Sequence, residues 1–285
     1  MKHRIEEDDV KQFTEMLREQ EKSRATIETY TRSVNSLRSW IGKDSEFDKN
    51  SVIAFKAQLR ERYKLNTANT YIVSLNSFFK FMGWHDCSLT TYKLQRKTFR
   101  DADKEITIEE YGRILEAARH LPHDRLFYLI QTIASTGIRV GELPFITVES
   151  LSQKRSCIYN KGKYREILIP SKLCILLKEY CQVHGIKSGS VFVTSHNAPL
   201  DRSGILKTMK KLSLEAGVSR DKLYPHNFRH FFAVNYYNSD RDIVHLADLL
   251  GHSNLNTTRM YTQISAEQQR TILDEVEERF IVKHG

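Results

Sequence analysis

Four segments in the second half of the chain gather side chains that could act together on a phosphodiester. They read TGIRVGEL at 136–143, NKGKYRE at 160–166, PHNFRH at 225–230 and LLGHSNLNTTRMYTQIS at 249–265. An arginine guanidinium can donate two parallel hydrogen bonds to phosphate oxygens, a histidine moves protons near neutral pH, and a tyrosine can form a covalent intermediate. Gathered in one site, these residue types would cleave a phosphodiester without a metal ion.

Tyr261 is the candidate nucleophile. A free tyrosine has a pKa of ~10, so roughly one in a thousand is phenolate at pH 7. Nearby cations favour the phenolate, and we expect Arg139 and Arg229 to do so here. The same two arginines would neutralise the charge that builds up on the nonbridging phosphate oxygens, where losing one preorganised donor typically costs about 3 kcal/mol.

The order and wording of these segments resemble the tyrosine recombinase family, which includes phage integrases and the Xer resolvases. The family signature of Arg, Lys, His-x-x-Arg, His or Trp, and Tyr falls at Arg139, Lys161, His226, Arg229, His252 and Tyr261. The interval between the Leu-Gly-His at 250–252 and the tyrosine also matches the family spacing. The resemblance covers most of 107–265, and residues 6–99 are similar to the family's helical core-binding domain.

The resemblance implies a site-specific recombinase that cleaves and rejoins DNA through a 3′-phosphotyrosyl link, for integration, excision, inversion or dimer resolution. Lys161 would protonate the 5′-hydroxyl leaving group, His226 would assist proton transfer, and His252 would hydrogen-bond the phosphate. Lys163 and Arg165 would contact DNA. The partner would be double-stranded DNA at a specific target site, bound by a homotetramer, and no cofactor is implied.

Other interpretations of the same residues stay open. The constellation would also serve a type IB topoisomerase, and a noncatalytic DNA-binding protein could keep the same fold. His226 and His230 lie four residues apart on a predicted helix and could hold the metal ion of a nuclease, although that ion would repel Arg229. Arg139 could instead form a surface ion pair with Glu142.

The first third of the chain is predicted to be helical throughout. Apolar residues recur three or four positions apart in ranges 7–21, from Ser23 onward, 50–63 and 67–82, which is the period of an amphipathic helix. Four such helices make a small bundle. We expect a core-binding domain at 1–99, a linker at 100–106 and a catalytic domain at 107–285.

The catalytic domain is predicted to mix helices with a small sheet. Thr107 and Glu110 form a capping-box pattern at the start of one helix, and a second helix ends at Gly137. Strands at 156–160 and 165–169 make a hairpin, and the run at 191–193 is either an edge strand or a loop. Further helices are expected at 203–216, 226–238, 242–250, 254–261 and 265–280. The expected fold is therefore mostly α with a small β-sheet: a helical bundle plus an α+β catalytic domain, whose last helix would dock on a neighbouring subunit.

Composition agrees with a DNA-binding enzyme. The chain has 44 Lys and Arg against 35 Asp and Glu, a net charge of +9, and a basic excess suits a polyanion. None of the 4 cysteines forms a Cys-x-x-Cys pair, so we expect free thiols and no metal. No apolar run approaches the ~18 residues of a membrane span, and the charged start MKHRIEEDDV is unlike a secretory signal. These features predict a cytoplasmic protein with no membrane partner.

Overall fold

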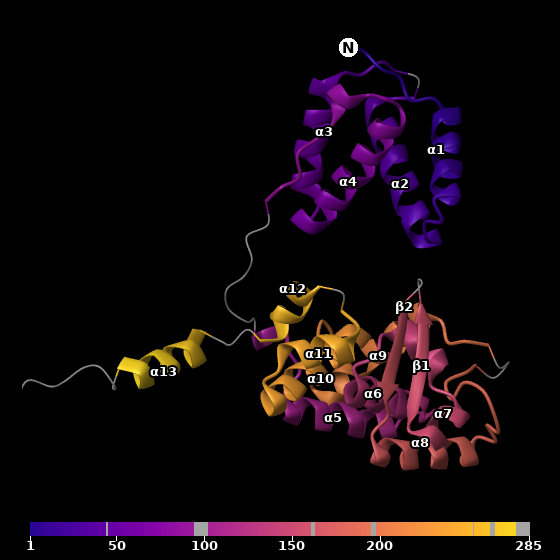
Figure 1. The fold of residues 1–285 in the computed structure, drawn as a ribbon, viewed down its shortest axis with the longest axis vertical. Coiled ribbons are helices and arrows are strands. Elements are labelled where there is room, and N and C mark those ends of the chain that lie inside the picture. The colour runs from indigo at the N-terminus through magenta and orange to yellow at the C-terminus, as the bar shows by residue number, and fades with distance from the viewer. Residues whose placement is uncertain are drawn as a thin grey trace, which may run out of the picture. The chain divides into compact units, whose positions relative to one another are not determined.

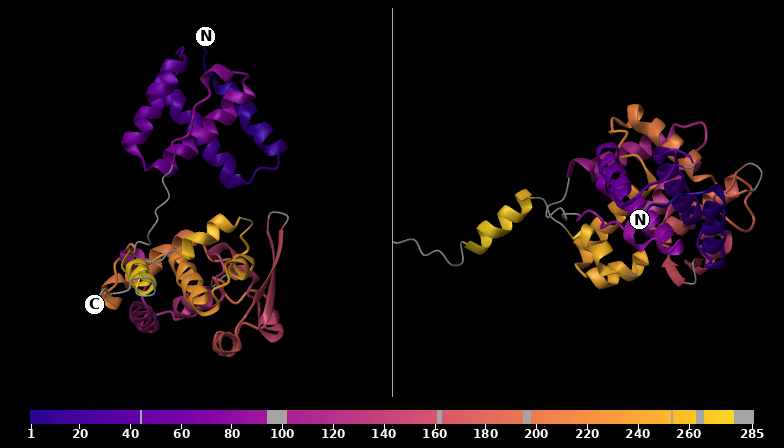
Figure 2. Two further views of the ribbon diagram at one scale, coloured as in Figure 1. Left: turned by 60° about the vertical axis from the view of Figure 1, so that its left-hand side comes forward. Right: turned by 90° about the horizontal axis from the view of Figure 1, so that it is seen from above.

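A computed structural model of the chain describes residues 1–43, 45–93, 102–160, 163–194, 198–252, 254–262 and 266–277. The chain divides into two compact units, Met1–Arg96 and Lys97–Gly285 (Figures 1 and 2). The later part of the predicted linker belongs to the second unit, because Ala102–Lys104 forms a short 3-10 helix, η2, and Ile106 is buried in that unit's core.

The first unit is a helical bundle. It contains α1 (Glu7–Glu19), α2 (Arg24–Ile41), α3 (Lys49–Arg62), α4 (Leu65–Phe81) and the 3-10 helix η1 (His85–Cys87). The Ser23 and Asp48 side chains accept backbone hydrogen bonds at the starts of α2 and α3, which satisfies donors that a helix leaves free at its first turn. Phe13, Leu37 and Phe78 are fully buried in its core. Aromatic stripes in this bundle therefore form the core, as the spacing predicts.

The second unit carries the four segments with candidate chemistry. Its elements are α5 (Ile108–Arg119), α6 (Arg125–Thr136), η3 (Val140–Phe145), α7 (Val148–Gln153), β1 (Arg155–Asn160), β2 (Lys163–Leu168), α8 (Ser171–Val183), α9 (Arg202–Ala216), α10 (Pro225–Asp240), α11 (Ile243–Leu250), α12 (Leu255–Thr258), η4 (Arg259–Tyr261) and α13 (Ala266–Glu277). The mostly helical fold with one small sheet is confirmed.

The predicted hairpin is present as an antiparallel pair. Its register runs from Arg155 opposite Leu168 to Asn160 opposite Lys163. Since side chains alternate between the faces of a strand, Ile158 and Ile167 lie on the face that is buried in the core. Arg165 stands opposite Ile158 and therefore shares the inward face.

The helices α7 and α8 were not among the helices predicted from the sequence. The longer one, α8, buries Leu173, Cys174, Leu177, Tyr180 and Cys181. These positions follow the helical period, and Pro170 precedes the first turn, so the signal was present. The run at 191–193 forms no strand among the described residues: Val193 makes only an isolated bridge with Pro199.

None of the helices within the described ranges combines the length and apolarity needed to cross a lipid bilayer.

Three helices of the second unit end at a glycine in the left-handed conformation, among them α9 at Gly217. Gly137 follows α6 with φ +64°, and Gly251 follows α11 with φ +62°. This backbone conformation favours glycine because a Cβ would be strained there. At Gly137 space is also lacking, because a Cβ would lie 2.4 Å from Cδ1 of Phe232 on α10. The close approach of α10 to the end of α6 thus depends on a glycine.

We expect Gly137→Ala to lower the free energy of unfolding by about 1–3 kcal/mol, because the new methyl group must displace the Phe232 ring. The measurement is the urea midpoint of the second unit's unfolding. Gly112→Ala is the matched control: Gly112 lies inside α5 with nothing within 4 Å of the added carbon, and the change should raise stability by about 0.5–1 kcal/mol. Equal behaviour of the two variants would contradict the packing argument.

Candidate active site

Arg229 on α10 is the buried centre of the site. Its guanidinium donates from Nη1 to the carbonyl oxygen of Gly137 at 2.5 Å and from Nη2 to that of Leu250 at 2.7 Å. Nη2 also lies 2.9 Å from Nε2 of His252. Burial, and next the charge of Arg139, lowers the pKa of Arg229 to about 10. The guanidinium is therefore still charged at neutral pH.

His252 is held on both of its ring nitrogens. Because Arg229 can only donate, Nε2 of His252 accepts, and Nδ1 then carries the proton toward Oγ1 of Thr258 at 2.9 Å. Burial, followed by the charges of Arg229, Arg139 and Arg165, lowers the pKa of His252 to about 4. The ring is neutral at pH 7 with one defined tautomer.

Tyr261 lies at the end of η4 and is only 2% exposed. Its ring is stacked on His252 with centroids 6.1 Å apart and meets the His230 ring edge-on at 5.0 Å. Burial raises the pKa of Tyr261, and the opposing positive charges of Arg229 and Arg139 are weaker. The two arginines do favour the phenolate, as expected from the sequence, but desolvation outweighs them and the net pKa shift of Tyr261 is upward.

Arg139 is the arginine that faces solvent. Its side chain is 45% exposed, with Nη1 2.9 Å from Oε1 of Glu142. The Glu142 carboxylate also accepts from the backbone nitrogen of Arg139 at 2.8 Å and from Nη2 of Arg165 at 2.7 Å. Glu142 is buried, so it is not the surface partner considered from the sequence. It joins Arg139 to the hairpin.

Arg165 lies inside the domain. Its side chain is 11% exposed and paired with Glu142. Its Cδ approaches Gly251 so closely that a Cβ there would lie 2.5 Å away. Nε and Nη1 of Arg165 are buried without a hydrogen-bond partner among the described residues. The structure therefore places this guanidinium beneath the hairpin surface on which the sequence analysis expected a DNA contact.

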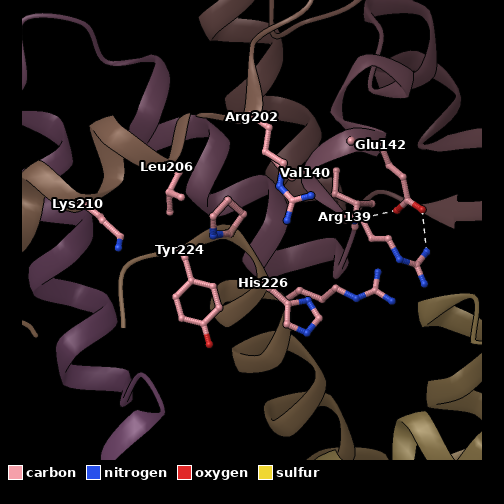
Figure 3. Close-up of a pocket in the computed structure, with 12 residues that line it drawn as sticks. Arg139, Val140, Glu142, Arg202, Leu206, Lys210, Tyr224 and His226 are labelled. Atoms are coloured by element: carbon pink, nitrogen blue, oxygen red, sulfur yellow. Dashed lines mark hydrogen bonds and ion pairs between the residues drawn. The ribbon is translucent and has the colours of Figure 1, made fainter. Parts of the chain in front are cut away.

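A pocket of about 510 Å³ brings Arg139, His226 and Arg229 together (Figure 3). His226 enters it from the first turn of α10, which begins at Pro225. Loss of water around the ring, and then the charges of Arg229, Arg139 and Arg202, lower the pKa of His226. The neutral imidazole is thus favoured at pH 7 and can accept a proton.

The remaining predicted site residues fall on the hairpin tip. Lys161 lies outside the described residues. Lys163 begins β2, but its side chain also lies outside what is described. Their predicted roles stay predictions.

Several residues of this site were not picked out from the sequence. Arg202 and Lys210 reach the pocket from α9, and Tyr224 stands before α10 (Figure 3). Arg202 and Lys210 are eight positions apart, which places them on similar sides of a helix, and that spacing was the available signal. Thr258 gave none, because its importance comes from its contact with His252.

The interpretation of His226 and His230 as a metal pair finds no support in the geometry. His226 lines the arginine-rich pocket, whereas Nε2 of His230 lies 3.7 Å from Oε1 of Glu105. Neither histidine belongs to a group of three or more potential metal ligands within the described parts of the chain.

The chain matches two described families. The phage integrase family matches residues 104–268, and the phage integrase N-terminal SAM-like domain matches residues 10–83. Among curated proteins, the tyrosine recombinase XerA of Thermococcus onnurineus is 30% identical over 259 residues, covering 87% of this chain and 88% of the relative. XerA of Pyrococcus furiosus is 27% identical over 275 residues, covering 93% and 92%.

Solved structures share the fold at lower identity. A lambda integrase dimer bound to a COC′ core site has a TM-score of 0.73 at 16% identity, covering 92% of this chain and 95% of that one. A XerH recombinase bound to its difH substrate has a TM-score of 0.68 at 20% identity, covering 94% and 89%. The matched families extend through both units. The chain therefore belongs to the phage integrase family and is a site-specific tyrosine recombinase, which breaks and rejoins DNA.

Proposed function

We propose that Tyr261 attacks a DNA phosphodiester, leaving a 3′-phosphotyrosyl link and a free 5′-hydroxyl. The observation that carries this proposal is the grouping of Arg229 and His252 beside Tyr261, while Arg139 and His226 line the pocket that Arg229 also lines. A bond forms between the tyrosine oxygen and phosphorus, while the bond from phosphorus to the 5′-oxygen breaks. The link conserves the energy of the original bond, so a 5′-hydroxyl from another strand can reverse the step without ATP.

Charges and protons can be assigned to individual residues. Arg139, which is open to the pocket, binds a nonbridging oxygen of the phosphate. The buried charge of Arg229 stabilises the negative charge of the transition state. His226 is neutral at pH 7 and takes the tyrosine proton, directly or through water. His252 donates to the phosphate from Nε2 once Arg229 releases that nitrogen and the ring proton moves from Nδ1 to Nε2. Lys161, by resemblance to the family, protonates the 5′-oxygen as it leaves.

The buried tyrosine implies that DNA binding completes the site. Tyr261 is 2% exposed in the free chain, so phosphorus cannot reach its oxygen until α12 and η4 shift. An incoming phosphate would attract Arg139 and Arg229. This attraction would favour an arrangement in which Arg229 turns from His252 toward the phosphate and α12 and η4 shift. We propose that the free protein is idle and that its target DNA exposes the nucleophile.

Arg165 has a positioning role in this proposal. Through Glu142 it fixes Arg139, and through its contact with Gly251 it fixes the loop that carries His252. A buried carboxylate needs a compensating cation, and Arg165 is that cation for Glu142. Arg165 and Lys163 lie on the same strand, β2. The contacts of Arg165 therefore also link the hairpin to Arg139 and to the loop before His252.

Four copies are proposed to act on two duplexes. A related lambda integrase forms a tetramer bound to a Holliday junction, and exchange between two duplexes requires four strand cuts. The last helix supports assembly, because Ile272, Leu273 and Val276 on α13 are all exposed. We propose that this apolar face docks on a neighbouring subunit.

The first prediction concerns the nucleophile. Nicked fragments of the source organism's DNA should form an SDS-resistant adduct with the protein without added metal, carrying a 3′-nucleotide on Tyr261 by mass spectrometry. Tyr261→Phe should lose the adduct while still binding DNA, and Tyr237→Phe on α10 should keep it. An adduct that persists in Tyr261→Phe would reject the assignment, and DNA binding without any adduct would indicate a noncatalytic protein.

The second prediction separates positioning from DNA contact. Arg165→Ala should slow cleavage at least tenfold with little change in DNA affinity. Arg155→Ala is the control, since Arg155 lies on the same hairpin but is paired at the surface with Glu166. If Arg165 instead bound a phosphate, its loss would weaken binding and reduce the salt dependence by about one counterion. Both variants are assayed at a temperature where melting curves show them folded.

The third prediction concerns assembly. Removing residues 266–285 should leave strand cleavage largely intact but weaken tetramer formation on DNA, measured by native gel shift and by recombination of two sites. Replacing Ile272 and Val276 together by serine should have the same effect, because it removes the apolar face and keeps the chain length. Recombination at the full rate by either variant would contradict docking through α13.

A further inference from the structure

We propose that His3, Asp86 and Cys87 form a binding site for a zinc-class divalent cation on the first unit. One imidazole nitrogen, one carboxylate oxygen and the thiol sulfur lie within 4.8 Å of one another. His3 is separated from Asp86 by 83 positions, so no ligand spacing in the sequence could indicate this group. All three residues belong to the first unit.

The His3 side chain is fixed before any ion arrives. Its backbone forms paired hydrogen bonds of 2.8 Å with Phe47 in both directions. Its ring stacks on Trp84 with centroids 4.7 Å apart and an interplanar angle of 27°. The side chain is only 7% exposed, and Nε2 points to Asp86, 3.1 Å from Oδ1 and 3.0 Å from Oδ2. Imidazole and carboxylate therefore already converge.

The thiol comes from the adjacent residue of a tight turn. Asp86 and Cys87 belong to η1, and the backbone nitrogen of Cys87 donates to the carbonyl of Trp84 at 3.1 Å. Cys87 is fully buried, whereas Asp86 is partly open to solvent. An ion would therefore reach the group from the solvent side, at the Asp86 carboxylate, and the Cys87 sulfur would bind it on the buried side.

The donor set favours zinc over the harder cations. Magnesium and calcium prefer oxygen ligands only, whereas zinc accepts nitrogen, sulfur and carboxylate together. Zinc bonds of about 2.0–2.3 Å in tetrahedral geometry place ligand atoms about 3.3–3.8 Å apart. The widest separation here must therefore close by about 1 Å, which a side-chain rotation supplies. Water would complete the fourth position. On binding, the Cys87 thiol would release its proton to solvent, and the resulting thiolate and the Asp86 carboxylate would balance the ion's charge.

A bound ion would tie the start of the chain to the end of the bundle. The His3 to Phe47 bridge meets the η1 turn through the contacts of the His3 side chain with Asp86 and Trp84 and through the edge-on packing of the Phe47 ring on Trp84. Metal binding to the folded state alone adds stability by mass action. The expected effect is structural and concerns the first unit, so strand cleavage in the second unit should not require it.

The test is a titration of the full-length, chelator-treated protein with Co²⁺, read by absorption. We expect one equivalent to produce a thiolate-to-cobalt charge-transfer band that Zn²⁺ abolishes, and Zn²⁺ should raise the melting temperature. Cys87→Ser should remove the band, and His3→Gln, which leaves the core thiol untouched, should weaken binding at least tenfold. Cys181→Ser, at another buried cysteine, is the control and should behave as the unaltered protein.

Two results would overturn the proposal. One is a titration of the unaltered, folded protein that gives no charge-transfer band at stoichiometric Co²⁺. The other is a band of unchanged strength in both Cys87→Ser and His3→Gln, which would place the metal elsewhere. In either case His3 and Asp86 are an ion pair beside a core thiol.

Discussion

The buried guanidinium of Arg229 is the interaction on which the catalytic unit depends. A cation withdrawn from water costs several kcal/mol unless fixed acceptors replace its hydration. Here those acceptors are carbonyls at the ends of α6 and α11, where a helix leaves its last carbonyls unpaired and its dipole is negative. Both ends turn through a left-handed glycine. Arg139 lies two residues after Gly137, and His252 comes directly after Gly251. The helix ends that hydrogen-bond Arg229 therefore also position the backbone of Arg139 and of His252.

Positive charge dominates the electrostatics of the site. Arg139, Arg165 and Arg229 lie close together, and Glu142 is the buried carboxylate among the described residues that offsets them. Burial, and then this positive surplus, lowers the pKa of His226 and of His252 and keeps both rings neutral. The tyrosine, in contrast, stays protonated because its own burial outweighs the cations. A phosphate entering this environment would meet positive charges that are already in place, which is how preorganised sites lower barriers, while α12 and η4 must still shift to expose Tyr261.

Much of the fold and of the site could be predicted from the sequence, because periodicity and motif order carry that information. The helices of the bundle, the hairpin and the helix ends at Gly137 and Gly251 follow from apolar spacing and glycine position. The family signature located Arg139, Arg229, His252 and Tyr261, which the fold brings together.

What could not be predicted depends on burial and on long-range contact. Arg165 lies two positions before Ile167 on the same strand and so shares its inward face, which the sequence pattern indicates. A basic residue near a hairpin tip is nevertheless more often exposed to solvent, so the sequence analysis predicted a DNA contact. The net pKa of Tyr261 reflects desolvation, which a list of neighbouring charges does not contain. The grouping of His3 with Asp86 and Cys87 arises only when the ends of the first unit meet.

The close approach of Arg165 to Gly251 has a consequence for how such a chain can change over time. A side chain at 251 would occupy the space of the Arg165 methylene carbon, so position 251 cannot gain a side chain while Arg165 is kept. Anyone who transplants the hairpin into another recombinase would have to carry the loop before His252 along with it.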